Sequence, residues 1–76
     1  MNKDEAKQEL SHAIQVWQRG GNYEVELDNG KTIDLEAMEC YLNGAGWNVE
    51  DIPEEKIDEI ASDYIDLFSL ELFRNL

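Results

Sequence analysis

The stretch YEVELDNGKTIDL, residues 23–35, decides the fold class of this 76-residue chain. Apolar and acidic residues alternate over residues 23–27, which is the pattern of a strand that buries one face. The turn-forming residues DNGK follow at 28–31, and a second short β-type stretch follows them. We therefore predict a β-hairpin whose turn places Gly30 in the left-handed conformation that glycine adopts at low cost.

The alternation also predicts the register of this hairpin. A two-residue turn would pair Glu26 with Ile33 and bring a carboxylate onto the apolar face. A three-residue turn over residues 28–30 pairs Val25 with Ile33 and Tyr23 with Leu35 instead. Because the second register keeps the apolar side chains on one face, we predict the three-residue turn.

A helix is predicted before the hairpin. Asn2 is a suitable N-cap, and Glu5 three residues later completes the pattern of a capping box. Apolar residues then recur at helical spacing, at Ala6, Leu10, Ala13, Ile14 and Trp17. Gly20 and Gly21 end this helix, since glycine tolerates the conformation that follows a C-cap.

A second helix is predicted over residues 35–43, with Asp34 as its N-cap. The residues expected to face the core are Met38, Tyr41 and Leu42, with Leu35 as a further candidate. The glycines of NGAG at 43–46 end the helix. A connector follows, and its apolar residues Trp47, Val49 and Ile52 are expected to fill the core.

The last helix is predicted to run from Pro53, at the first helical position, to about Arg74. Its inner stripe consists of Ile57, Ile60, Ala61, Tyr64 and Phe68. The order helix, β-hairpin, helix and long C-terminal helix predicts a small α+β fold. Residues 1–76 are expected to form a single compact acidic domain.

Charge and composition narrow the classes of function. Eighteen Asp and Glu against six Lys and Arg give a net charge of −12, which disfavours direct binding to nucleic acid or to an anionic membrane. The single Cys40 forms no internal disulfide and the N-terminal residues lack an apolar signal core, so we expect a cytoplasmic protein. No apolar run approaches the roughly 20 residues of a membrane span. A basic protein is the natural partner.

The sequence offers little for catalysis or metal binding. His12 and Cys40 fall on different predicted helices, and we interpret them as a surface histidine and a half-buried thiol rather than a nucleophile pair. The segment DNGKTIDLE at 28–36 has the glycine of a calcium loop but lacks the alternating oxygen ligands before it. We therefore expect no enzyme activity, no cofactor and no bound metal.

Acidic residues dominate the segment NVEDIPEEKIDEIASDYID, residues 48–66. From residue 50 to 66, eight carboxylates against Lys56 give a net charge of −7 over 17 residues. As helix this segment would span roughly 25 Å, or about one charge per 3.6 Å, close to the one phosphate per roughly 3.4 Å of a DNA strand. The candidate partner-binding residues are Glu50, Asp51, Glu54, Glu55, Asp58, Glu59, Asp63 and Asp66, with Glu24 and Glu26 on the hairpin and Glu36 and Glu39 on the second helix. Two interpretations stay open: a solvated face that aids solubility, and a surface that occupies the basic groove of a partner.

The segment LFSLELFRNL, residues 67–76, carries apolar side chains around most of a helix rather than along one stripe. We favour burial of these side chains in the core. The alternatives are a homodimer through the C-terminal helix and an anchor into the partner. Trp17 and Trp47 raise the same choice between core and interface anchor.

In size, charge and lack of catalytic residues, the chain resembles the small acidic DNA-mimic inhibitors of phages and mobile elements, the anti-restriction and anti-CRISPR proteins. This resemblance rests on no alignable motif and assigns no role to any residue. It implies a non-enzymatic inhibitor of a basic nucleic-acid-binding protein or nuclease complex in a bacterial host cell. From the residues themselves, we expect the acidic helix to supply the electrostatics and a neighbouring aromatic residue such as Tyr64 or Trp47 to add local specificity. The alternatives are an immunity-like or adaptor protein that neutralises a basic toxin or enzyme without mimicry, and a structural domain that dimerises.

Overall fold

The first helix, α1, spans Lys3–Gln18 in the computed structural model, which describes residues 1–73 of the chain. The amide of Glu5 donates to the side chain of Asn2 (2.8 Å), and the amide of Asn2 donates to the Glu5 carboxylate (3.1 Å). The predicted capping box is thus confirmed. The five predicted apolar positions of α1 are buried, and the helix ends before Gly20, whose φ is +80°.

The hairpin consists of β1 (Val25–Glu26) and β2 (Thr32–Ile33), which pair antiparallel. Val25 lies opposite Ile33, as the pattern of buried and exposed positions predicted. Gly30 has a φ of +85°, which an L-residue rarely adopts. The predicted register and the left-handed glycine of the turn are confirmed.

The ladder is shorter than predicted, and the pairing of Tyr23 with Leu35 is not part of it. The reason is the start of the next helix, α2 (Leu35–Ala45). The carboxylate of Asp34 accepts a hydrogen bond from the amide of Ala37 (2.9 Å), so the chain turns into the helix directly after β2.

α2 extends two residues beyond the prediction and ends at Gly46, whose φ is +85°. Met38 and Leu42 are buried as predicted, while Tyr41 is half-buried. The glycine takes the left-handed conformation that commonly closes a helix.

The connector after α2 contains a short 3-10 helix, η1 (Val49–Asp51). Ile52 is buried, whereas Trp47 is only half-buried against the core. The side-chain amide of Gln18, at the end of α1, donates to the carbonyls of Val49 (3.0 Å) and Ile52 (2.9 Å). One glutamine therefore ties the connector to the first helix.

The predicted long C-terminal helix is wrong in its extent. The structure contains α3 (Glu54–Leu67), then a turn at Phe68, then the single helical turn α4 (Ser69–Leu72). Pro53 is the N-cap residue rather than the first helical residue. The predicted end near Arg74 lies outside the described residues.

The hairpin turn holds α4 in place. The side-chain amide of Asn29 donates to the carbonyl of Leu72 (2.9 Å), and the ammonium of Lys31 donates to the carbonyl of Glu71 (2.6 Å). Carbonyls at the end of a helix lack partners within the helix, so these two contacts satisfy groups that would otherwise need water. Residues some 40 positions earlier in the chain thus fix the bent C-terminal turn.

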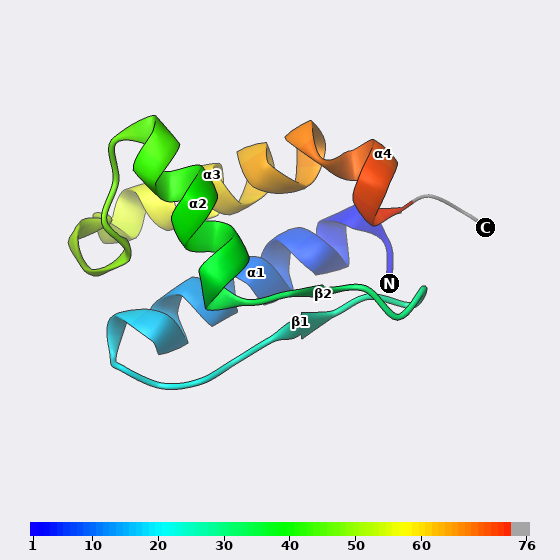
Figure 1. Ribbon diagram of the computed structural model, residues 1–76, viewed down its shortest axis with the longest axis horizontal. Coiled ribbons are helices and arrows are strands. Elements are labelled where there is room, and N and C mark those ends of the chain that lie inside the picture. The colour runs from blue at the N-terminus through cyan, green and yellow to red at the C-terminus, as the bar shows by residue number, and fades with distance from the viewer. Residues whose placement is uncertain (74–76) are drawn as a thin grey trace.

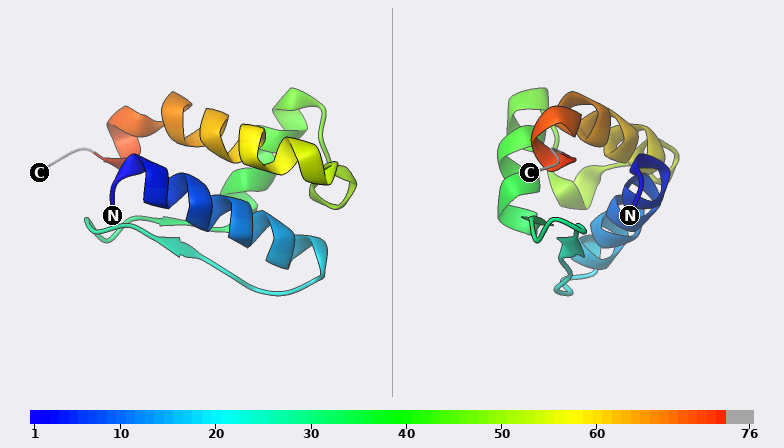
Figure 2. Two further views of the ribbon diagram at one scale, coloured as in Figure 1. Left: turned by 180° about the vertical axis from the view of Figure 1, so that it is seen from behind. Right: turned by 90° about the vertical axis from the view of Figure 1, so that its right-hand side faces the viewer.

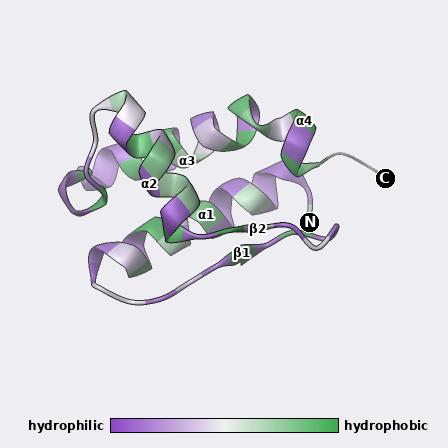
Figure 3. Cartoon of the chain, in the orientation of Figure 1, coloured by the Kyte–Doolittle hydropathy of each residue, from purple (hydrophilic) through white to green (hydrophobic). Residues whose placement is uncertain are grey.

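The elements surround one core between the hairpin and α3. In Figure 1, α3 runs along one edge of the molecule and the hairpin along the opposite edge, with α1 between them. The end view of Figure 2 shows α2 on the side opposite α1, where it crosses from the hairpin to the edge formed by α3. The most extensive contact joins α1 to α3. Figure 3 shows hydrophobic and hydrophilic positions alternating along each long helix, as expected when one side of the helix is buried.

Candidate protein-binding surface

Six exposed carboxylates line α3, and we call them the acidic face. They are Glu54, Glu55, Asp58, Glu59, Asp63 and Asp66. The opposite side of the helix is buried through Ile57, Ile60, Ala61, Tyr64 and Ile65. The sequence predicted this division except for Ile65, which lies one helical turn beyond Ala61 and extends the stripe. Amphipathic spacing therefore places every carboxylate of the helix in solvent.

The linear charge of the acidic face is lower than the sequence count indicated. Six carboxylates and Lys56 give α3 a net charge of −5 over its 14 residues. At about 1.5 Å per residue the helix is roughly 21 Å long, or about one net charge per 4 Å. The predicted density included residues 50–53, which precede the helix. The density is still of the order of a nucleic-acid strand.

Two ion pairs within residues 1–73 involve the acidic face. Lys56 lies 3.4 Å from Glu59 on the same helix, and Lys7 of α1 lies 3.1 Å from Asp66. Pairs this exposed contribute about 0–1 kcal/mol, because water and salt screen them. They leave the surface strongly negative.

Asp58 has a structural contact that the sequence did not reveal. The hydroxyl of Ser11 on α1 donates to its carboxylate over 2.8 Å, and Ser11 is 8% exposed. A serine on the buried side of α1 needs an acceptor, since an unpaired buried hydroxyl is unfavourable. Asp58 therefore fixes the packing of α3 on α1 as well as contributing charge.

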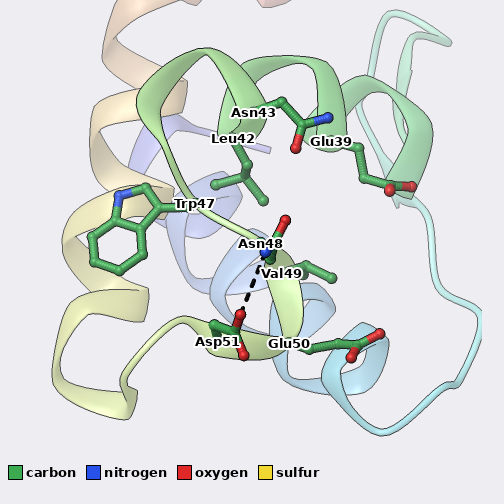
Figure 4. Close-up of a pocket in the computed structure, with 8 residues that line it drawn as sticks. All are labelled: Glu39, Leu42, Asn43, Trp47, Asn48, Val49, Glu50 and Asp51. Atoms are coloured by element: carbon green, nitrogen blue, oxygen red, sulfur yellow. Dashed lines mark hydrogen bonds between the residues drawn. The ribbon is translucent and has the colours of Figure 1, made fainter.

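Three further candidate acids gather beyond the N-terminal end of α3. Glu50 and Asp51 of η1 and Glu39 of α2 line a hollow of about 190 Å³, together with Trp47 (Figure 4). The side-chain amide of Asn48 donates weakly to Asp51 at 3.4 Å. The structure thus brings an acid from α2 beside the connector, which residue spacing alone did not predict.

The remaining candidate acids lie apart from the acidic face. Glu24 and Glu26 are exposed on the hairpin, at the edge of the molecule opposite α3 (Figure 1). Glu36 is exposed in the first turn of α2, directly after the hairpin. The candidate acids are therefore divided between two edges of the molecule and do not all gather around α3.

The C-terminal apolar residues divide between the core and the surface. Leu72 is 8% exposed and belongs to the core, and Phe68 and Phe73 pack partly against it. Leu67 and Leu70 are 66% and 86% exposed, and we call these two side chains the leucine patch. Leu76 lies outside the described residues.

The aromatic residues also separate. Trp17 is 4% exposed and its indole donates to the carbonyl of Tyr23 (3.0 Å), so it belongs to the core. Tyr64 is 7% exposed, which removes it as a direct specificity contact. Trp47 is half-buried and keeps that role open. The ring of Tyr41 lies edge-on to that of Tyr64, with 5.2 Å between centroids. Burial of Tyr41, and then the negative charge of Asp63, raises the pKa of the Tyr41 hydroxyl.

His12 and Cys40 are both exposed, on α1 and α2 respectively. The predicted half-buried thiol is therefore wrong. The imidazole lies edge-on to the ring of Tyr23, with 5.0 Å between centroids, and the Tyr23 hydroxyl donates to the carboxylate of Glu9. Over residues 1–73, no three His, Cys, Asp or Glu side chains gather in an arrangement that could hold a metal ion.

Comparisons with protein-family models, with curated proteins and with solved structures gave no significant match. Among the helices within residues 1–73, none has the length and apolar content that crossing a bilayer requires.

Proposed function

We propose that this chain is a non-enzymatic inhibitor of the anti-restriction or anti-CRISPR type, carried by a phage or mobile element. It acts in the cytoplasm of a bacterial host and binds a basic nucleic-acid-binding protein or nuclease complex. The acidic face of α3 occupies the groove in which the partner holds its nucleic acid, and Trp47 with its neighbouring acids extends the contact.

The observation that carries the proposal is the exposure of six carboxylates on one 14-residue helix with a single lysine among them. Acids three or four positions apart repel and destabilise the helix. A face that served solubility alone would gain stability from interspersed lysines. A basic groove offsets the repulsion on binding, and the resulting field accelerates association with the partner.

The experiment uses two double variants that remove the same charge from different edges. E55Q/E59Q neutralises two acids of α3, and E24Q/E26Q neutralises two acids of the hairpin. Each variant has a net charge of −10, two fewer negative charges than the −12 of the natural chain. All four side chains are exposed, so we expect both variants to fold. Each immobilised protein is incubated with bacterial lysate, and bound proteins are identified before and after elution with DNA or RNA.

The proposal predicts that the natural chain and E24Q/E26Q capture the same nucleic-acid-binding protein, that added nucleic acid releases it, and that E55Q/E59Q captures much less. An equal loss in both variants would show that net charge alone governs capture. A partner that all three proteins hold, and that nucleic acid does not release, would instead indicate an immunity-like or adaptor protein. If the natural chain captures no protein, the proposal is wrong and the acidic face is only a solvated surface.

A further inference from the structure

The two side chains of the leucine patch are apolar but do not pack into the core. Within residues 1–73, Leu67 and Leu70 are the two large hydrophobic side chains that are exposed to solvent. They lie three positions apart across the bend between α3 and α4. Leu70 also borders a hollow of about 450 Å³ together with Phe73 and Lys31. Isolated surface leucines are common, but two exposed leucines at one bend, with Leu70 at the rim of such a hollow, form a place where an apolar side chain can seat.

The surroundings of the patch are acidic. Asp63 lies one helical turn before Leu67, and Asp66 directly precedes it. Glu71 is exposed next to Leu70. Lys31, which borders the same hollow, already donates its ammonium to the carbonyl of Glu71, and Lys7 already pairs with Asp66. The patch is therefore the apolar end of the acidic face rather than a separate surface.

Area and charge together identify the kind of occupant. Two leucines present far less than the roughly 800 Å² that a stable interface buries on each partner, so any partner that covers them must also cover adjoining surface. A second copy of this chain fits poorly, because a two-fold interface centred on the patch would bring together the acidic surroundings of both copies, Asp63 and Asp66 among them. A protein surface that alternates apolar side chains with lysine or arginine matches both the leucines and the acids.

We propose that the leucine patch is the apolar anchor of the interface formed by the acidic face, and that it seats against apolar side chains flanked by Lys or Arg on the partner. This inference rests on the proposed function and deepens it. The anchor supplies affinity that salt does not screen, while the carboxylates supply the salt-sensitive part.

The test uses two synthetic helical peptides as defined probes. One repeats leucine on one side of the helix and lysine on the other, and the second has every leucine replaced by glutamine. Binding of both peptides is measured by calorimetry or fluorescence anisotropy at several salt concentrations. The proteins are the natural chain, L67Q/L70Q, the control A45Q and E55Q/E59Q. Ala45 is an exposed apolar position at the end of α2, so its variant controls for a polar substitution elsewhere on the surface.

The natural chain and A45Q are expected to bind the leucine–lysine peptide about ten-fold or more tightly than the glutamine–lysine peptide. L67Q/L70Q should lose that preference at every salt concentration while its salt dependence stays unchanged. E55Q/E59Q should bind both peptides less tightly, with a weaker salt dependence, and keep the preference. Equal preference in the natural chain and L67Q/L70Q overturns the anchor and leaves the proposed function standing. If E55Q/E59Q binds both peptides as tightly as the natural chain and still prefers the leucine–lysine peptide, the leucine patch is an anchor but the acidic face does not contribute to binding. That result overturns the proposed function and the joint interface, and it is distinguishable from loss of the anchor.

Analytical ultracentrifugation tests whether a second copy of this chain covers the leucine patch. The proposal predicts that the natural chain and L67Q/L70Q sediment alike as monomers. A concentration-dependent dimer of the natural chain that L67Q/L70Q abolishes would assign the patch to a second copy and overturn the proposal.

Discussion

Substitution of Asp63 tests most directly whether repulsion between the carboxylates of α3 lowers the free energy of unfolding. This exposed side chain lies one turn after Glu59 and one turn before Asp66, with no ion pair among the described residues. Each like-charge pair at such spacing destabilises a helix by about 0.2–0.5 kcal/mol, and an opposite-charge pair stabilises it by a similar amount. Asp63→Lys reverses two pairs, for a gain of about 1–2 kcal/mol. Since Lys7 already pairs with Asp66, the lower end of this range is expected.

The assay is urea unfolding followed by circular dichroism, at low salt and again at high salt. Urea is preferred to guanidinium chloride because the latter is itself a salt and screens the charges under test. A gain of about 1 kcal/mol corresponds to a rise in melting temperature of about 4–8 °C for a domain of this size. Asp63→Asn serves as the control, since it removes the repulsion without adding attraction, and about half of the gain is expected.

High salt should reduce the gain of Asp63→Lys to the small difference in helix propensity between lysine and aspartate. The reasoning is refuted if Asp63→Lys is no more stable than the natural chain at low salt. A gain that salt leaves unchanged would likewise assign the effect to propensity and not to charge.

Two other changes test the contacts that hold the fold. Gln18→Ala removes both hydrogen bonds to the connector and should lower the free energy of unfolding by about 1–3 kcal/mol, because two carbonyls lose their partner. Urea unfolding measures this difference. A variant as stable as the natural chain would mean that water replaces the glutamine at no cost. The hydrogen bond to Glu9, followed by burial and by the charge of Glu9, raises the pKa of Tyr23 from 10.0. The neutral phenol therefore contributes stability that is fully present below pH 10 and is lost as the pH rises through the raised pKa. Tyr23→Phe should be less stable by about 1 kcal/mol at neutral pH, and its difference from the natural chain should shrink above pH 10; a difference independent of pH up to strongly alkaline solution contradicts this account.

Local physical rules predicted those parts of the fold that depend on near neighbours. The hairpin register followed from keeping Glu26 off the apolar face, and the helix start from the capping pair Asn2 and Glu5. The left-handed conformation of Gly30 followed from the three-residue turn of the hairpin. Each of these features is determined within about ten residues of sequence.

The features that sequence reasoning missed depend on residues far apart in the chain. Nothing at Phe68 interrupts the helical pattern, since neither glycine nor proline is present there, and Asn29 and Lys31 of the hairpin turn bind the bent segment that follows. The pairing of Ser11 with Asp58 joins positions 47 residues apart. Long-range contacts of this kind have no periodic signal in a single sequence.

The candidate site was predicted in composition but not in arrangement. Exposure of the α3 carboxylates followed from helical periodicity. The separation of Glu24 and Glu26 from α3 depends on how the helices stack between the two edges, which spacing does not encode (Figure 2). The exposure of Leu67 and Leu70 depends on the bend at the end of α3, and the helical pattern of the sequence, which predicts a continuous helix, contains no signal for that bend.

The central claim is that the acidic face of α3 and nucleic acid compete for one groove on the partner. The most direct measurement is displacement of labelled DNA or RNA from the captured partner, followed by fluorescence anisotropy, as each protein is titrated in. The natural chain and E24Q/E26Q should displace the nucleic acid at equal concentrations, whereas E55Q/E59Q should require about ten-fold more or greater. A partner that holds the chain and its nucleic acid together, or two variants that displace equally well, would contradict the claim.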